Sequence, residues 1–254
     1  MEDRPQTEDY AKFDPEWYLD NYIGTEEASI NMRLDLNIYH RFFSQNPIRG
    51  KRLLDVGTGP SIHTVISASN HVDEIFLSDY TSQNRQYLEK WRSGKIDHPK
   101  MMIDYVSSLD GRTVTAEERE KEIRQKVKGI VPIDVTSQQP LGSDYDGAPF
   151  DIIVTSYCFE AAVSNVAEYK SCIENVSTLL KKGGYLVLAA CLEGGLYQVG
   201  EYNYRTINIS RKQIDSAMAE TGYKTIAAEE IQGTAVDAQL QDFSSYYFIV
   251  GSKC

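Results

Sequence analysis

The fold of this chain is decided by Leu53–Pro60, which reads LLDVGTGP. An apolar run that ends in a Gly-x-Gly turn and leads into a helical pattern is typical of the first strand of a parallel sheet and its binding loop. Glycine permits backbone angles closed to other residues and lets a ligand approach the main chain. The third glycine of the dinucleotide fingerprint is missing, because Ile62 stands three residues after Gly59. The stretch therefore favours a ligand without a pyrophosphate, with a tight turn that binds nothing as the alternative.

Strand and helix patterns alternate after this loop. Apolar strand candidates cover 52–56, 74–78, 130–135, 150–156 and 185–192, and helical patterns cover 82–91, 117–128, 166–180 and 211–220. Strands that alternate with crossover helices predict a doubly wound α/β fold, with a parallel sheet and helices on both faces.

Three more segments complete this expectation. The helix over 166–180 is expected to stop at the Lys-Lys-Gly-Gly of 181–184. Two further strand candidates, 223–231 and 246–251, have no helical pattern between them and are expected to pair as an antiparallel hairpin. We expect 97–115 to be a loop with some local structure.

The first 45 residues carry little strand signal and are expected to be helical. Asp14 followed by Pro15 is a typical helix start, because Asp caps the free N–H groups and Pro fits the first helical position. A second helix is expected over 26–43, with one face formed by Ile30, Leu34, Ile38 and Phe42. We therefore divide the chain into an N-terminal helical cap, 1–45, and a main unit, 46–254.

The composition disfavours several classes of protein. Lys and Arg number 26 against 37 Asp and Glu, and the net charge of −11 disfavours nucleic acid or an anionic membrane as a partner. No apolar run approaches the roughly 20 residues of a membrane span. The N-terminus is polar and acidic, unlike a signal or transit peptide.

Cysteine and histidine spacing predicts no metal site. The four cysteines lack the spacing of a zinc or redox motif, and the four histidines are scattered. Cys172 and Cys191 lie in apolar patterns and are expected to be buried, inert thiols. We expect a reducing, cytoplasmic compartment.

Polar residues stand at the carboxyl ends of the second and third strands. Asp79 ends the second strand, where a carboxylate can accept the hydroxyl protons of an adenosine ribose; capping the next helix is the alternative. Asn84 lies one helical turn further. Asp134 ends the third strand and can accept the adenine amino group, with an ordinary turn residue as the alternative. Because the ends of parallel strands share one edge of the sheet, these positions together predict a nucleoside site.

The fourth strand and its exit, Phe150–Ala162, supply the next candidates. Ser156 and Glu160 fall where a substrate would meet the nucleoside-bearing cofactor. Capping a helix is the alternative role for Glu160.

Five segments, matched in order and spacing, resemble one known family. They are Phe13–Leu19 (FDPEWYL), Leu54–Pro60 (LDVGTGP), Ser78–Asn84 (SDYTSQN), Asp134–Gly142 (DVTSQQPLG) and Leu179–Gly184 (LLKKGG). The chain resembles the family of nicotinamide, phenylethanolamine and indolethylamine N-methyltransferases over nearly its whole length. The resemblance implies a seven-stranded, mostly parallel, Rossmann-like methyltransferase sheet with an N-terminal helical cap. It also implies S-adenosylmethionine as methyl donor, S-adenosylhomocysteine as product, and a small pyridine or arylalkylamine as acceptor.

Carried over position by position, the resemblance implies two adjoining sites. The donor would contact Tyr18, Tyr22, Gly57, Thr58, Gly59, His63, Asp79, Tyr80, Asn84, Asp134, Val135 and Ser156. The acceptor would lie near Glu160, Ala190, Tyr197, Thr206 and Asp242. Tyr18 and Glu160 are the expected catalytic residues: Tyr18 closes over the reaction centre, and Glu160 is the base or the amine anchor.

Several positions depart from the family pattern. His63 stands where a Tyr is usual near the methionine end of the donor, and Ile23 stands at the second Tyr of the cap, beside Tyr22. Ala190 replaces an Asp of the nicotinamide enzyme. Gly194 replaces an acidic residue of the phenylethanolamine enzyme, and Asp242 is the candidate to supply a carboxylate in its place. The acceptor therefore stays open among nicotinamide, nicotinate, phenylethanolamines, tryptamines and other amines.

Three rival interpretations remain. An O- or S-methyltransferase would use the same scaffold. A dinucleotide-dependent oxidoreductase is disfavoured by the missing third glycine. A catalytically weak binding paralogue would keep the nucleoside pocket and lose turnover. We expect a monomer.

Overall fold

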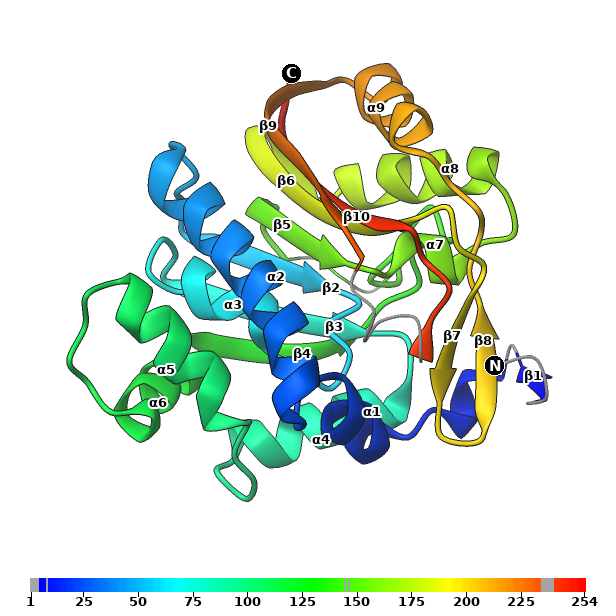
Figure 1. The fold of residues 1–254 in the computed structure, drawn as a ribbon. Coiled ribbons are helices and arrows are strands. Elements are labelled where there is room, and N and C mark those ends of the chain that lie inside the picture. Colours follow the sequence, from blue (N-terminus) through cyan, green and yellow to red (C-terminus); the bar gives the residue numbers. More distant parts are fainter. Residues whose placement is uncertain (1–4, 8, 144, 146, 234–239) are drawn as a thin grey trace.

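The computed structural model describes residues 5–7, 9–143, 145, 147–233 and 240–254. It has a central seven-stranded sheet with helices on both faces, and a three-stranded sheet beside it (Figure 1). The central strands are β2 (Arg52–Val56), β3 (Glu74–Asp79), β4 (Val127–Pro132), β5 (Phe150–Ser156), β6 (Leu180–Leu192), β9 (Tyr223–Gln232) and β10 (Ser245–Lys253). The main helices are α1 (Pro15–Tyr22), α2 (Glu26–Gln45), α3 (His63–Ala68), α4 (Ser82–Arg92), α5 (Lys100–Leu109), α6 (Ala116–Lys126), α7 (Phe159–Ala162), α8 (Val166–Ser177) and α9 (Arg211–Glu220).

The strand order of the central sheet is β4-β3-β2-β5-β6-β10-β9. The first five strands pair in parallel, and β10 pairs antiparallel with both β6 and β9. The predicted doubly wound sheet and the hairpin of its last two strands are therefore confirmed. The chain proceeds from β2 to β4 in one direction and returns to β5 on the other side of β2. The carboxyl ends of β2 and β5 consequently form the switch point at which such sheets bind ligands.

Two apolar clusters hold the helices against the sheet. One face packs against α2 to α6, through buried side chains such as Tyr39, Trp91 and Ile103. The other packs against α7, α8 and α9, through side chains such as Phe159 and Ile173. The N-terminal region and the hairpin that follows β6 lie at the carboxyl edge of the parallel strands (Figure 1).

The N-terminal region lies over that edge. Asp14 caps α1 by accepting hydrogen bonds from the N–H groups of Glu16 and Trp17, so the predicted helix start is confirmed. The short strand β1 (Gln6–Thr7) joins β8 (Tyr202–Arg205) and β7 (Leu196–Val199) in the small sheet, which ties the N-terminus to the segment after β6. Division of the chain at residue 45 stays a prediction.

The third strand begins earlier than its apolar pattern indicates. The prediction of 130–135 is wrong by three residues, because α6 ends at Lys126 and β4 covers Val127–Pro132. Asp134 and Val135 consequently follow the strand as a loop. The segment 97–115, expected to be mostly loop, contains the helix α5, whose Met102, Ile103 and Val106 are buried against α2 and α3.

The helix before β6 is shorter than predicted. Its pattern extends to residue 180, but α8 ends at Ser177 and β6 starts at Leu180. Leu180 pairs with Phe150, and the Nζ of Lys181 lies 2.6 Å from Oδ1 of Asp151. These contacts with β5 draw the Lys-Lys-Gly-Gly stretch into the sheet, where Gly183 has a φ of 75°.

The buried face of α2 was predicted only in part. Ile38 and Phe42 are buried, whereas Ile30 and Leu34 are 54% and 38% exposed. The other buried apolar positions of the second half of α2 are Leu36, Tyr39 and Phe43, and α2 packs against α3 and α5. Four-residue spacing alone did not reveal where that contact begins.

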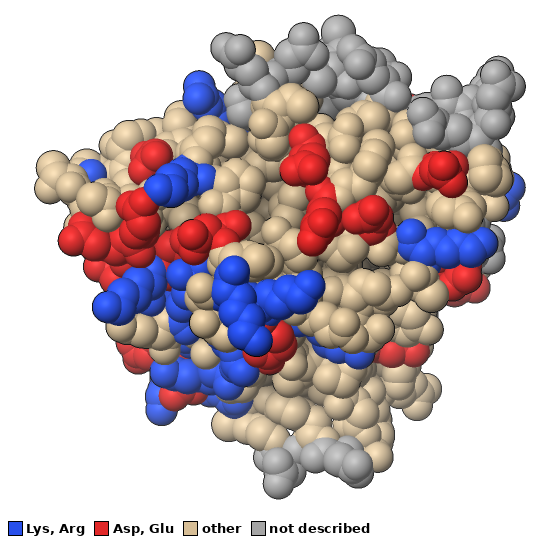
Figure 2. Space-filling model, turned by 90° about the horizontal axis from the view of Figure 1, so that it is seen from below, with Lys and Arg blue, Asp and Glu red and all other residues tan. Residues whose placement is uncertain are grey.

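Charged side chains of both signs share the surface. Figure 2 shows Lys and Arg side chains gathered beside Asp and Glu side chains on one face. Some of these opposite charges form ion pairs, such as Arg124–Asp97 and Arg112–Glu122, both at 2.8 Å. Within the described ranges, no helix has the length and apolar character needed to span a membrane.

Candidate active site

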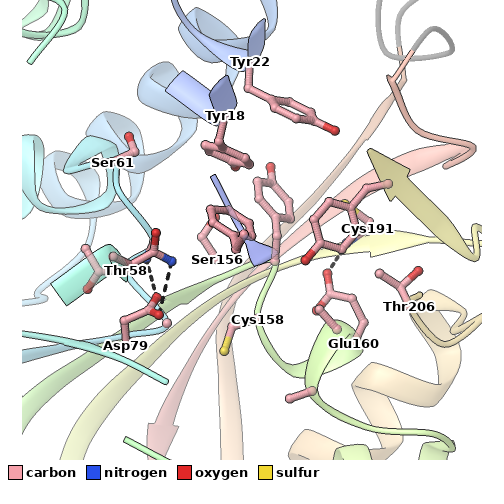
Figure 3. Close-up of a pocket in the computed structure, with 18 of the residues that line it drawn as sticks. Tyr18, Tyr22, Thr58, Ser61, Asp79, Ser156, Cys158, Glu160, Cys191 and Thr206 are labelled. Atoms are coloured by element: carbon pink, nitrogen blue, oxygen red, sulfur yellow. Dashed lines mark hydrogen bonds between the residues drawn. The ribbon is translucent and has the colours of Figure 1, made fainter. Parts of the chain in front are cut away.

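A cavity of about 500 Å³ lies at the carboxyl edge of the sheet. Its walls come from α1 and α2, the loops after β2, β3 and β4, the exit of β5, and parts of β6, β7 and β8. Figure 3 shows side chains of these elements pointing toward one space, with Tyr18 and Tyr22 on one side and Asp79 and Glu160 on the other. The topological switch point and the N-terminal cap therefore enclose the same cavity.

The Gly-x-Gly loop forms one end of the cavity. Gly57 has a φ of 68°, and a Cβ atom there would lie 2.4 Å from Sγ of Cys158. Gly59 has a φ of 62° and donates its N–H to Oδ2 of Asp79 at 2.8 Å. Thr58 donates its N–H to the carbonyl oxygen of Ser78. The two glycines let this loop bend close to both β3 and the exit of β5.

Asp79 lies beside this loop, 6% exposed. Its Oδ1 accepts hydrogen bonds from the N–H and hydroxyl of Thr81 and from Nδ2 of Asn84. Thr81 is the residue that caps α4, so capping is not the role of Asp79. Burial raises the pKa of Asp79, although these hydrogen bonds oppose the shift.

Asn84 offers an acceptor to a ligand. It is 4% exposed and lines the cavity, and its Oδ1 has no hydrogen-bond partner among the described residues. A buried amide oxygen without a partner is costly, and a ligand hydroxyl would satisfy it.

The next part of the wall follows β3 and β4. Tyr80, Asp134 and Val135 all line the cavity, and the side chain of Tyr80 is largely exposed. Asp134 does act as a turn residue, because its Oδ1 accepts hydrogen bonds from the N–H and hydroxyl of Thr136. Both the turn and the ligand interpretation of Asp134 are therefore compatible with its place.

His63 lies between the Gly-x-Gly loop region, at Ser61, and the end of β5, at Ser156. Its Nδ1 is 3.0 Å from Oγ of Ser61, and its Nε2 is 3.4 Å from Oγ of Ser156. Burial lowers the pKa of His63 to about 4, so the ring is neutral at pH 7. A neutral ring in the cavity wall does not repel a cationic ligand.

Glu160, on α7, lines the cavity and is 1% exposed. Its Oε1 accepts the N–H of Cys191 at 2.8 Å, whereas Oε2 has no partner among the described residues (Figure 3). Burial raises the pKa of Glu160 to about 7. The hydroxyl of Thr206, also in the cavity wall, similarly lacks a partner in the described part of the chain. Because Glu160 binds β6, capping α7 is not its role.

Tyrosine side chains form the wall of the cavity on the side away from Asp79 and Glu160 (Figure 3). The rings of Tyr18 and Tyr22 stack with centroids 4.6 Å apart, and the Tyr22 hydroxyl donates to the carbonyl oxygen of Gln198. Tyr197 donates its hydroxyl to that of Tyr10 at 3.4 Å, and Tyr10 donates in turn to the carbonyl oxygen of Ala161. The cap is therefore joined to α7 and to the small sheet through side chains that also line the cavity.

Two predicted acceptor residues lie outside the cavity wall. Ala190 is fully buried in the apolar cluster under α8 and α9, because successive residues of β6 point to opposite faces, and Cys191 lines the cavity instead. Asp242 accepts the N–H groups of Gly195 and Leu196 at 2.8 Å and so holds the loop before β7. The other fifteen predicted positions line the cavity: Tyr18, Tyr22, Gly57, Thr58, Gly59, His63, Asp79, Tyr80, Asn84, Asp134, Val135, Ser156, Glu160, Tyr197 and Thr206.

Further side chains that were not among the predicted site residues also line the cavity, and they include Tyr10, Asp35, Tyr157 and Cys158. Asp35 falls on a mixed apolar and polar helix, and Tyr157 and Cys158 directly follow a strand. Only the φ of 55° at Tyr157 marks that residue as unusual, and sequence does not reveal backbone angles of this kind.

The residues fit an adenosine-bearing cation. Asn84 supplies an acceptor that the described part of the protein does not satisfy, and Asp79 stands at the end of β3 where a ribose is bound in doubly wound sheets. The ring of His63, neutral at pH 7, and the carboxyl of Glu160 line the same cavity, and neither group repels a cation.

Comparison with known sequences gives one family and relatives that are N-methyltransferases by name. The sequence matches the model of the NNMT/PNMT/TEMT family over residues 4–254. Nicotinamide N-methyltransferase of Sus scrofa is 32% identical to it over 96% of this chain and 94% of its own length. Phenylethanolamine N-methyltransferase of Macaca mulatta is 30% identical over 85% of this chain and 79% of its own length.

Solved structures with the same fold are more distant in sequence. The N-methyltransferase NodS of Bradyrhizobium japonicum, in complex with S-adenosylhomocysteine, superposes with a TM-score of 0.52 at 12% identity, over 95% of this chain and 93% of its own. The glycopeptide N-methyltransferase MtfA, complexed with sinefungin, gives a TM-score of 0.56 at 10% identity, over 87% and 94%. These likenesses concern the fold, and they confirm the predicted Rossmann-like methyltransferase architecture.

Proposed function

This chain belongs to the NNMT/PNMT/TEMT family, and on that basis we propose that it methylates the nitrogen of a small cationic amine. Membership confirms the resemblance found in the sequence and makes the protein an S-adenosylmethionine-dependent small-molecule N-methyltransferase. S-adenosylmethionine supplies a methyl group that is already activated on a sulfonium sulfur. The tasks left to the chain are to bind donor and acceptor, to align them, and to handle the proton of the acceptor.

The charges around the cavity support a cationic acceptor. Asp35, Asp79, Asp134 and Glu160 line it, and within the described residues Arg205 is the one Lys or Arg that does. Arg205 is largely exposed and donates to Oε1 of Gln6. A cavity with this imbalance attracts ammonium and sulfonium groups and disfavours an anionic acceptor such as nicotinate.

Glu160 is the observation that carries the proposal. An alkylamine is mostly protonated at neutral pH and must lose its proton before its lone pair can attack. A general base works best when its pKa lies near the working pH, and burial brings the pKa of Glu160 to about 7. Its Oε2 has no partner in the described part of the chain and can accept that proton.

The donor would be held by the residues at the ends of β2, β3 and β4. In this proposal Asp79 and Asn84 bind the ribose hydroxyls, the Gly57–Gly59 loop approaches the methionine part, and Asp134 and Val135 border the adenine. This assignment is supported by the fact that all of these residues line one cavity.

The tyrosines of the cap exclude water and orient the acceptor. Tyr18 is half-buried at the cavity wall and stacks on Tyr22, so the two rings shield a molecule beneath them from solvent on that side. Alignment of two reactants in this way can lower a barrier by on the order of 7–11 kcal/mol.

A pyridine is the second candidate acceptor. It is favoured by the relatives named nicotinamide N-methyltransferase, which include the porcine protein at 32% identity. A pyridine nitrogen has a free lone pair at neutral pH, so its methylation requires no base.

A methylation screen tests the proposal. Purified protein is incubated with isotope-labelled S-adenosylmethionine and a panel of arylalkylamines, alkylamines and pyridines, and the products are read by mass. We expect methylated amines together with one equivalent of S-adenosylhomocysteine. Methylation confined to pyridines would favour the second candidate, and product from none of the compounds would contradict both.

We further propose that the enzyme works as a monomer in the cytoplasm. The four cysteines are free thiols, which suits a reducing compartment. Gel filtration with light scattering and fractionation of the source cells test these two points.

A further inference from the structure

A second carboxylate lines the same cavity from the side opposite Glu160. Asp35 lies on α2, which covers one face of the sheet, whereas Glu160 lies on α7 at the other face. Both residues are more than nine-tenths buried, with 8% and 1% of their surface exposed. The function proposed above assigns proton transfer to Glu160 and counts Asp35 only among the charges that line the cavity.

Tyr157 holds Asp35 in place. Its hydroxyl donates to Oδ2 of Asp35 at 2.8 Å, which joins the exit of β5 to α2. The φ of Tyr157 is 55°, in the left-handed region that is rare for a bulky side chain. Such a backbone persists only where its surroundings enforce it, and strained residues of this kind cluster at ligand sites.

The surroundings of Tyr157 do enforce it. Its ring packs edge-on against Tyr246 and Phe248, with centroids 5.6 and 6.4 Å away. Its N–H donates to the carbonyl oxygen of Ala189 at 2.9 Å. These contacts fix the ring so that its hydroxyl reaches Asp35.

The two carboxylates act on one small region. Burial raises the pKa of Tyr39 well above its usual value, and the negative charges of Asp35 and Glu160 both add to that shift. Burial likewise raises the pKa of Tyr18, and Asp35 contributes in the same direction. Tyr18, Asp35 and Glu160 all line the same cavity, so an acceptor bound there has two carboxyl groups within the cavity wall.

We propose that Asp35, oriented by Tyr157, binds a hydrogen-bond donor of the acceptor other than the nitrogen that is methylated. The acceptors of this enzyme then carry two donor groups, as in arylalkylamines with a ring hydroxyl or in diamines. Tyr157 is a positioning residue in this arrangement. The inference rests on the proposed function, because it needs Glu160 for the reacting nitrogen.

Binding of matched amine pairs tests the inference without turnover. The protein is loaded with S-adenosylhomocysteine, and calorimetry measures the dissociation constants of a phenylethylamine and its ring-hydroxylated counterpart, and of a monoamine and a diamine of equal length. We expect the wild type to bind the member with the second donor roughly 10- to 100-fold more tightly, as one hydrogen bond to a charged group provides. The pair that shows this ratio identifies the donor as hydroxyl or ammonium.

Two variants locate the effect. Asp35→Asn is expected to lower the ratio of the two dissociation constants in a pair by at least about fivefold. The affinity for the simple amine should stay within about threefold of the wild-type value. Tyr157→Phe keeps the ring packing, removes the hydroxyl, and is expected to lower the ratio less. Asp104→Asn, at an exposed position of α5, is the matched control and should keep the wild-type ratio.

Several outcomes would overturn the inference. A wild type that binds both members of each pair equally has no second recognition point. An unchanged ratio in Asp35→Asn, with or without weaker binding of both members, assigns Asp35 a structural role. A melting curve shows whether Asp35→Asn folds. If it does not fold, Tyr157→Phe provides the test, and a wild-type ratio of dissociation constants in that variant also overturns the inference. Absence of amine methylation would instead contradict the proposed function, and the binding ratios would still be measurable.

Discussion

At the scale of single residues, burial changes what a carboxyl group can do. Glu160 and Asp79 lie in one cavity, yet their contacts differ. Asp79 is held by three hydrogen bonds to Oδ1 and one to Oδ2, whereas Glu160 receives one bond at Oε1 and has an unpartnered Oε2 among the described residues. The first arrangement suits a fixed binding group, and the second suits a group that exchanges a proton.

Replacement of Glu160 by Gln is expected to separate the two candidate acceptors. The amide cannot take a proton, so kcat for an amine should fall by about 10²- to 10⁴-fold, while methylation of a pyridine should change little. In the wild type the amine reaction should accelerate as pH rises through about 7, because the carboxyl loses its proton there. Steady-state kinetics between pH 5 and 9 measures both effects.

Glu174→Gln, at an exposed position of α8, is the matched control and should retain the wild-type profile. Equal losses for amines and pyridines in Glu160→Gln would remove Glu160 from the role of base.

Replacement of Asp79 by Ala is expected to abolish measurable donor binding. The change removes a carboxylate at the ribose position and leaves the N–H groups of Gly59 and Thr81 without their acceptor. Each lost bond to a charged group costs about 1.5–3 kcal/mol, so affinity should fall on the order of 10²-fold or more. Calorimetry with S-adenosylhomocysteine measures this, and Asp73→Ala, exposed at the start of β3, is the control. Unchanged affinity in a folded Asp79→Ala protein would place the nucleoside elsewhere.

At the scale of elements, the site depends on how closely the loops after β2 and β5 approach. Gly57 and Cys158 belong to these two loops and touch where the sheet order reverses. A side chain at Gly57 would push the Gly57–Gly59 loop away from the exit of β5. This displacement would occur whether or not Gly57 or Cys158 contacts a ligand.

Gly57→Ala is therefore expected to be more harmful than an ordinary substitution of a left-handed glycine. The left-handed backbone alone costs an Ala about 1–2 kcal/mol, and the Cβ atom would also lie 2.4 Å from Sγ of Cys158. Gly94→Ala is the matched control, since Gly94 has a φ of 72° and open space around it. Chemical denaturation should show a larger loss for Gly57→Ala, and the double variant Gly57→Ala with Cys158→Ala should recover part of it. Equal losses at the two glycines would contradict the close approach.

At the scale of the whole molecule, buried neutral histidines limit stability in acid. His98 is 3% exposed between Trp91 and Tyr87, and neither ring nitrogen has a partner in the described part of the chain. Burial lowers the pKa of His98 to about 3. Between the unfolded pKa of about 6.5 and this value, the unfolded chain binds a proton that the folded one does not, so stability falls as pH falls.

His98→Phe is expected to reduce that acid sensitivity, because a Phe ring packs against the same aromatic neighbours and does not titrate. Urea denaturation at pH 7 and at pH 4.5 measures the loss of unfolding free energy on acidification. The loss should be smaller in the variant than in the wild type. Buried carboxyls such as Asp55, whose pKa is raised to about 7 by burial, act in the opposite direction and destabilise the fold as pH rises. An identical loss in both proteins would show that His98 does not contribute.

Much of the fold could be read from local patterns. The alternation of apolar strands with amphipathic helices, the Asp14 cap of α1, and the Gly-x-Gly turn all reflect interactions within a few residues. The errors occurred where a distant contact decided a boundary. Pairing with Phe150 drew Leu180 into β6, and packing against α2 and α3 made α5 a helix.

The sequence by itself determined the sheet class and the cavity wall at the ends of β2, β3 and β4, because parallel strands deliver their carboxyl ends to one edge whatever lies around them. Only the tertiary structure decided which residues of α2, β6 and the exit of β5 complete that wall. It directed Cys191 into the cavity and Ala190 into the core, and it brought Asp35 from α2 to Tyr157 at the exit of β5. These residues are 122 positions apart, and their meeting depends on helix packing and on one left-handed backbone angle. Neither the helix packing nor this backbone angle produces a periodic pattern in the amino-acid sequence.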